Sequence, residues 1–395
     1  MVYDTALASP PALNRRFVRL QAVLRLYAFY VCKRANYDWA LDQIRGHFVP
    51  DAFADPLVDR AQFAQEEQQA LTLFTSHLTS TSIPLDVADP SSDRVRASVT
   101  RALAHYEHEL AQDIHRLEEG MKEAMEKISQ AYARIWQLLV EWSYIARKQV
   151  ERPQLSRPHA MVVPVTIAQS HVLQRLQNDH VLAKRVQQEA AGWEDHRPLV
   201  ERWYNQFIKP CPAVQQYLAH PMLPHQEQQL LVFLIESIIF KKRGIQAFFS
   251  DVDLKWSLHK RFVKKQVQWG LENLMREGQA SAATPVLDWS THGQQEQRFY
   301  RALVRRTLQQ EAALDELIAK KAKNWSIDRI MLLDKTIIKL ALCEMLYFDD
   351  IPMKVSINEY IELSKLYSMP KSSQFVNGLL DAVAATLHQG RSRSN

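Results

Sequence analysis

Apolar residues recur at helical spacing along most of this chain, so the pattern predicts a protein built from α-helices. A first helix is expected over 14–34, with Asn14 as its N-cap. Its apolar stripe consists of Phe17, Leu20, Leu24, Tyr27 and Val31, and Arg15, Arg19, Tyr30 and Lys33 point roughly the opposite way on a helical wheel. Further helices are expected at about 37–45, 58–78, 294–321, 326–347, 356–367 and 370–388. The expected fold class is all-α.

The sharpest period lies between residues 103 and 145, where apolar residues repeat at alternating steps of three and four and only Glu107 interrupts them. The seam consists of Leu103, Leu110, Ile114, Leu117, Met121, Ala124, Ile128, Ala131, Ile135, Leu138, Trp142 and Ile145. A seven-residue repeat of this length favours a narrow, coiled-coil-like seam in one long helix over a broad globular face. This seam must pack against other helices. They are either helices of the same chain, several of which are expected within residues 166–277, or the same seam of a second copy through self-association.

The last helix contains Asn377-Gly378, a pair that ordinarily marks a β-hairpin. The apolar period continues across the pair, so we expect a helix that accepts a glycine at a cost of ~1 kcal/mol relative to alanine. Gly378, Ala382 and Ala385 share one face, which predicts close packing of another helix there; a kink at Gly378 is the alternative. Asn377 is expected as a buried polar link between helices.

The helix expected at 356–367 begins with a sequence typical of a capping box. In such a box the Ser356 hydroxyl accepts from the amide of Glu359, and the Glu359 carboxylate reaches back to the first amide. We therefore assign both residues a structural role.

Composition narrows the class of protein. The chain has 395 residues, 47% of them apolar, which suffices for two or three domains. Its three cysteines lie far apart and suit a reducing compartment, so neither a disulfide framework nor a metal site is predicted. The most apolar run, at 230–240, is too short to span a bilayer and contains Glu236. The first residues do not resemble a signal peptide, and we expect a cytoplasmic protein without a membrane partner.

Charge is unevenly placed, although the net charge is only +5. Residues 1–34 contain six cations and a single acid, Asp4; the cations are Arg15, Arg16, Arg19, Arg25, Lys33 and Arg34. Such a bias points to a polyanionic partner, with a solvated helix face as the alternative. No pair of side chains has the spacing of a nucleophile and its base, so catalysis is not predicted.

Motifs in the C-terminal quarter resemble those of the NusB family of transcription antitermination factors. They are "NWSIDRIMLLDKTIIKLALCEMLY" at 324–347, "IPMKVSINEYIELSK" at 351–365 and "FVNGLLDAV" at 375–383. The stretches 299–318 and 14–27 are similar to two other helices of the family. The resemblance implies paired helical bundles interrupted by a long insertion, as in the Bacteroidota form. It divides the chain into a disordered tail (1–13), a first core part (14–45), a helical insertion (46–291), a second core part (292–388) and a tail (389–395).

The resemblance also implies function. Family members bind the single-stranded boxA element of ribosomal RNA leader transcripts together with NusE, a small-subunit ribosomal protein, in the elongating RNA polymerase complex. They have no catalytic activity and no cofactor. In the first helix, Arg15, Arg16 and Arg19 match the family's basic cluster and Tyr27 its tyrosine; the family also uses the start of the last helix, around Phe375, at the RNA surface. The candidate RNA-binding residues are Arg15, Arg16, Arg19, Tyr27, Tyr30, Lys33, Lys371, Gln374 and Phe375.

Several of these positions have a second interpretation or depart from the family pattern. Tyr27 could be buried instead of contacting a base, and Phe375 could be an ordinary core aromatic. Leu24 and Phe17 replace a glutamine and a basic residue that are usual in the family, and Lys371 replaces an acidic one.

Two other functions remain open. Ribosomal RNA cytosine methyltransferases carry a NusB-like domain before their catalytic domain, which here would have to follow residue 388 of a chain that ends at 395. A helical protein-interaction scaffold, built on the seam at 103–145 and without RNA binding, is the second.

Overall fold

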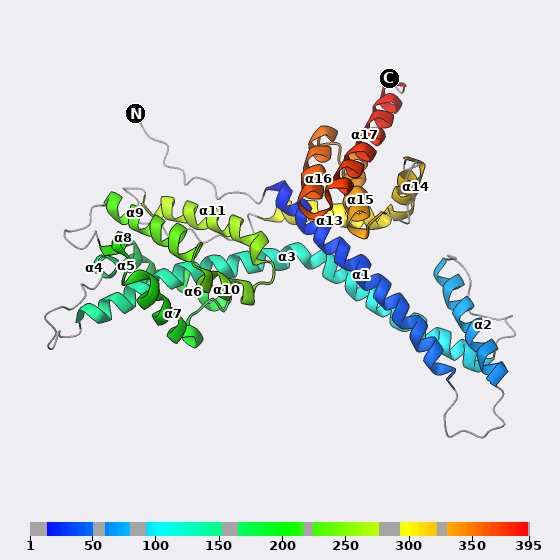
Figure 1. Ribbon diagram of the computed structural model, residues 1–395, viewed down its shortest axis with the longest axis horizontal. Helices are drawn as coiled ribbons and strands as arrows, with labels where there is room; N and C mark the ends of the chain where they lie inside the picture. The colour runs from blue at the N-terminus through cyan, green and yellow to red at the C-terminus, as the bar shows by residue number, and fades with distance from the viewer. Residues whose placement is uncertain are drawn as a thin grey trace. The chain divides into compact units, whose positions relative to one another are not determined.

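The computed structural model describes residues 14–49, 60–79, 92–151, 165–215, 224–275, 293–321 and 330–393. Every regular element within these ranges is helical, which confirms the all-α class (Figure 1). The predicted loops at 79–93, 152–165 and 277–294 and the tail at 1–13 lie almost entirely outside these ranges. No helix within them is long and apolar enough to cross a membrane.

The chain forms two compact units, which divide near Gly120 and Gln297 instead of at the expected boundaries 45/46 and 291/292. One, called the split unit below, consists of Arg15–Gly120 and Arg298–Asn395; the other, called the middle unit, is Met121–Gln297. The first part of the expected insertion thus folds with the family-like helices, because its apolar residues share a core with α1. That core includes Ala40, Ile44, Phe74, Val99 and Tyr106.

The split unit is built from two groups of helices. α1 (Arg15–His47) packs with α2 (Arg60–Thr79) and the first part of α3 (Asp93–Glu151). The remaining elements are most of α13 (Gln294–Gln309), α14 (Glu311–Lys321), α15 (Leu332–Tyr347), α16 (Met353–Tyr367) and α17 (Pro370–Arg393). α15 contacts α1, α14, α16 and α17, so it is the central helix of the second group (Figure 1).

The middle unit surrounds the second part of α3. Its helices are α4 (Val165–Ala168), α5 (His171–Gln177), α6 (His180–Gln188), η1 (Glu194–His196), α7 (Arg197–Trp203), η2 (Tyr204–Ile208), α8 (Pro212–Gln215), α9 (Pro224–Phe233), η4 (Leu234–Ile239), α10 (Arg243–Val252) and α11 (Trp256–Met275). The apolar run at 230–240 lies in α9 and η4, where most of its side chains are buried as expected.

α3 is longer than its seam, with 59 residues and a length of ~88 Å at ~1.5 Å per residue. The seam is largely buried within the chain itself. The prediction of a narrow seam is nevertheless wrong for the second part of the helix, where Tyr132, Trp136 and Leu139 are buried as well. Helices of the middle unit cover several sides of α3 there: Ser129 Oγ donates to Glu189, and Trp193 Nε1 donates to the Arg134 carbonyl. Self-association is therefore not needed to cover the seam.

Other helix boundaries differ from the sequence expectation. α1 continues through the expected break near residue 35, because neither glycine nor proline interrupts it there. The helix expected at 294–321 ends and restarts around Gln310. α16 begins at Met353, three residues before the expected start, and α17 runs on to Arg393 through much of the expected tail.

Candidate nucleic-acid interface

The orientation of α1 differs from the face predicted by its apolar stripe. Arg19 is 2% exposed and Tyr30 is buried, whereas Tyr27 is 37% exposed and Val31 is exposed. The physical reason is a second set of apolar residues in α1, outside that stripe, which are all buried: Val18, Ala22, Val23, Leu26 and Phe29. Arg19 and Tyr30 lie among them and turn inward with them, and Tyr27 is left on the exposed side.

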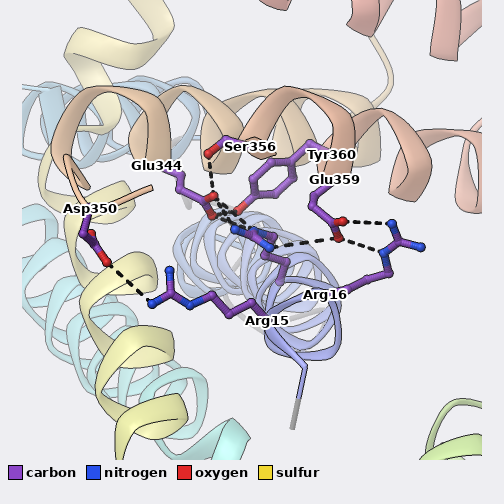
Figure 2. A network of polar contacts seen from close by, with 8 residues as sticks. Arg15, Arg16, Glu344, Asp350, Ser356, Glu359 and Tyr360 are labelled. Atoms are coloured by element: carbon purple, nitrogen blue, oxygen red, sulfur yellow. Dashed lines mark hydrogen bonds and ion pairs between the residues drawn. The ribbon is translucent and has the colours of Figure 1, made fainter. Parts of the chain in front are cut away.

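Arg19 belongs to a buried polar network, of which Figure 2 labels Glu344, Ser356 and Tyr360. Its Nη2 and Nε donate to the two carboxylate oxygens of Glu344, at 2.7 and 2.9 Å. The same carboxylate accepts from Ser356 Oγ at 2.6 Å and from the Tyr360 hydroxyl at 3.1 Å. The prediction that Arg19 contacts RNA phosphates is wrong for this conformation, because its guanidinium is enclosed and paired with Glu344 and, at 4.0 Å, with Glu359.

The predicted capping box is also wrong. Pro352 is the N-cap of α16, which places Ser356 and Glu359 inside the helix, one turn or more from its start. Ser356 donates to Glu344 instead of accepting from a backbone amide. Glu359 binds Arg16, whose Nε and Nη2 donate to its two oxygens at 2.7 and 2.8 Å (Figure 2). This bidentate bond lowers the pKa of the Glu359 carboxyl below its ordinary value.

Arg15 is the most loosely paired of the three N-terminal arginines. Its Nη2 lies 3.5 Å from Asp350 Oδ2, and the two side chains are 45% and 67% exposed. An exposed pair at this distance contributes little to folding stability, so Arg15 can readily bind another anion in place of Asp350. The Arg15 guanidinium also lies 5.4 Å from the centre of the Phe299 ring.

Tyr30 and Lys33 belong to a second cluster of charges around α14 and α15. Lys339 Nζ binds Glu311 Oε1 at 2.8 Å and Asp315 Oδ2 at 3.0 Å, and it lies 4.9 Å from the centre of the Tyr30 ring. Burial raises the pKa of the Tyr30 hydroxyl. Lys33, half-buried, lies 3.5 Å from Glu311. A role of Tyr30 at the RNA surface is contradicted by its burial.

On α17, Lys371 and Gln374 are exposed and Phe375 is half-buried. Asn377 is exposed, so the prediction of a buried polar link is wrong. Gly378 is exposed too, and a methyl group built on it would have no neighbour within 4 Å, which contradicts close helix packing at this position. Val376, Leu379, Leu380 and Val383 form the buried face instead.

The exposed candidates therefore lie on two helices with shared neighbours. Arg15, Arg16 and Tyr27 come from α1, and Lys371 and Gln374 come from α17; both helices contact α15 and α16. Cations, one exposed aromatic ring and an amide can together bind an unpaired, phosphate-bearing strand. In the described ranges no three His, Cys, Asp or Glu side chains are grouped so that they could hold a metal ion.

Sequence reasoning missed Glu344, which holds the network together. A signal was present, because Glu344 is the single acid within the apolar stretch "IIKLALCEMLY" of α15. An acid within so apolar a stretch needs a buried cationic partner, and the basic cluster of α1 offers candidates for it.

Comparisons with known proteins find relatives of part of this chain. The NusB family model matches residues 266–385. The transcription antitermination protein NusB of Natranaerobius thermophilus is 45% identical over 94 residues, which are 24% of this chain and 68% of that protein. That of Bacillus subtilis is 43% identical over 91 residues, 23% of this chain and 70% of that protein.

Coverage varies among the relatives. The chain spans only 38% of the NusB of Chloroherpeton thalassium, to which it is 50% identical over 80 residues. A solved structure of "T. maritima NusB" matches 42% of this chain and 93% of its own, with 25% identity and a TM-score of 0.23. On the extent and identity of the sequence matches, the chain belongs to the NusB family.

Proposed function

We propose that the chain is an RNA-binding transcription antitermination factor. It binds boxA-type leader sequence of ribosomal RNA together with NusE, a small-subunit ribosomal protein, within the elongating RNA polymerase complex in the cytoplasm. The observation that carries the proposal is the exposed set Arg15, Tyr27, Lys371 and Gln374, on two helices that share α15 and α16 as neighbours. No catalytic step is part of the proposal.

The proposed roles follow from accessibility. Arg15 and Lys371 supply the phosphate contacts, because neither is held in a buried ion pair. Tyr27 supplies a ring on which a base stacks, and Gln374 an amide for a base edge. Phe375, next to Gln374 in α17, is half-buried. Arg16 and Lys33 contribute positive charge, partly offset by Glu359 and Glu311.

Replacing Arg15 or Lys371 by glutamine tests the proposal. Each substitution removes one phosphate contact, so we expect binding of a boxA-containing RNA to weaken by roughly 5- to 10-fold and the salt slope to fall by about 1. The measurement is a titration of labelled RNA at several salt concentrations. Lys320→Gln is the matched control, because Lys320 is an exposed lysine of the same unit on α14.

The control decides what a loss means. If Lys320→Gln weakens binding as much as Arg15→Gln, the RNA responds only to total charge, and the proposed surface is wrong. If neither Arg15→Gln nor Lys371→Gln changes a measurable affinity, RNA binds elsewhere on the chain.

A further inference from the structure

A cavity of about 540 Å³ opens between the last turns of α1 and the first turns of α3, both in the split unit. Its size falls in the range of sites for small ligands. Trp39, Gln43 and Gly46 line it from α1, and Ser98, Arg101 and His105 from α3. This part of α3 lies in the expected insertion, outside the residues that match the family model.

Trp39 is the exposed aromatic side chain of this cavity. It is 43% exposed, whereas Trp136, Trp142, Trp193 and Trp256 are all buried. Its ring lies on the imidazole of His105, with 3.8 Å between ring centres and 38° between planes. The imidazole fixes the position of the indole and leaves part of the ring open, which makes Trp39 suited to stack on a planar group.

Arg101 is an exposed cation without a counter-charge. The first part of α3 carries three other arginines, and each pairs with a carboxylate: Arg94 with Glu66, Arg96 with Asp93 and Arg116 with Asp113. Within the described ranges, Arg101 has neither an ion pair nor a hydrogen bond from its side chain. A site with an open ring and an uncompensated guanidinium favours a planar ligand that carries negative charge.

The remaining lining favours a nucleotide over a protein segment. As far as the structure describes the lining, it contains no Leu, Ile, Val, Met or Phe, which a groove for an apolar peptide would present. Gln43 and Ser98 offer hydrogen bonds instead, and the one acid, Asp42, binds Arg45 at 2.8 Å.

We propose that this cavity binds an unpaired nucleotide of single-stranded RNA, with the base on Trp39 and the phosphate at Arg101. The inference rests on the proposed function, because the strand would continue from Arg15 along α1. The 24 residues from Arg15 to Trp39 span ~36 Å at ~1.5 Å per residue, which corresponds to ~11 nucleotides at a stacked spacing of ~3.4 Å.

RNA length tests the inference. We would compare a boxA RNA of about 8 nucleotides, within the ~4–16 nucleotides of one single-strand binding site, with an RNA of about 24 nucleotides. The unpaired flanks of the longer RNA cover the ~11 nucleotides between Arg15 and Trp39. With the wild-type chain, the longer RNA is expected to bind about tenfold more tightly, since one stacked base contributes a factor of that order.

Three substitutions test whether the tighter binding of the longer RNA, called the length gain, comes from the cavity. Trp39→Ala and Gly46→Leu are each expected to remove most of the length gain and to leave the shorter RNA unaffected. Gly46→Leu fills the cavity without disturbing the fold, because a methyl group at Gly46 meets nothing within 4 Å and leucine favours the helix. Arg101→Gln is expected to lower the salt slope for the longer RNA by about 1. Arg96→Gln, on the same helix, is the matched control and should retain the length gain.

The outcomes separate the two proposals. Binding of the shorter RNA without a gain from length, or a gain that survives Trp39→Ala and Gly46→Leu, overturns the nucleotide site and leaves the proposed function standing. Failure of both RNAs to bind overturns the proposed function and the site with it. Loss of NusE binding in Gly46→Leu, with RNA binding unchanged, would make the cavity a protein-docking site and contradict the inference.

Discussion

Arg19→Ala is expected to destabilise the chain by about 3–5 kcal/mol, the usual cost of leaving one partner of a buried ion pair behind. The Arg19 and Glu344 side chains are both almost fully enclosed, so removal of the guanidinium leaves the Glu344 charge buried without its cation. Ser356 and Tyr360 would still donate to that carboxylate, but neither can neutralise its charge. The free energy of unfolding from denaturant titration is the measurement.

Two controls identify the cause of this loss. Arg15→Ala breaks an exposed pair and should cost less than ~1 kcal/mol. The double variant Arg19→Met/Glu344→Gln should recover part of the loss, because no charge remains buried and the glutamine oxygen still accepts from Ser356. If Arg19→Ala unfolds no more easily than Arg15→Ala, the buried network does not hold α1 on α15.

This result also decides how RNA binding is tested. A variant that removes Arg15, Arg16 and Arg19 together, which the basic cluster alone would suggest, mixes loss of a surface contact with loss of folding stability. Arg15 and Lys371 are accessible and can be changed without touching the network.

Lys339→Met is expected to cost about 2 kcal/mol, between the values of exposed and fully buried pairs. The lysine is buried, but its partners Glu311 and Asp315 are each about one-third exposed. In the variant, Glu311 still pairs with Lys33, and Asp315 still pairs with Lys335. Thermal unfolding at neutral pH is the measurement, and an unchanged midpoint would contradict the assignment of this cluster.

The pH dependence of stability gives an independent check on the same cluster. Burial acts to raise the pKa of the Glu311 carboxyl, but the hydrogen bond and charge of Lys339 outweigh it, so the folded-state pKa lies below the ordinary 4.5. The stabilisation is then fully present above about pH 4.5 and is lost as the pH falls through the lower, folded-state pKa. Lys339→Met should flatten this acid loss.

Much of the helical architecture could be predicted from the apolar period alone. The period marks α3 and α17 correctly, since a long run of apolar residues at steps of three and four has no other regular solution. It predicts the wrong face for α1, because this helix has apolar residues on two sides and the buried side, with Val18, Ala22 and Leu26, also contains an arginine and a tyrosine. The buried partner of Arg19, Glu344, lies 325 positions further along the chain.

The candidate surface was predictable in part. Arg15, Lys371 and Gln374 are accessible, as a binding role requires, because they lie near helix starts where few neighbours cover them. The roles of Ser356, Glu359, Asn377 and Gly378 were not predictable, because each depends on where its helix begins or on which face it turns inward. The cavity beside Trp39 could not be predicted from the sequence, because it is formed by two helices that are distant along the chain.

The most direct test of the central claim is the affinity for a boxA-containing leader RNA, with and without NusE from the same organism. A scrambled RNA of equal length and composition serves as the control. The account predicts saturable binding of the boxA RNA, strengthened by NusE about tenfold or more, as expected for coupling between two ligands on one protein. Equal affinity for boxA and scrambled RNA, unchanged by NusE, would contradict it.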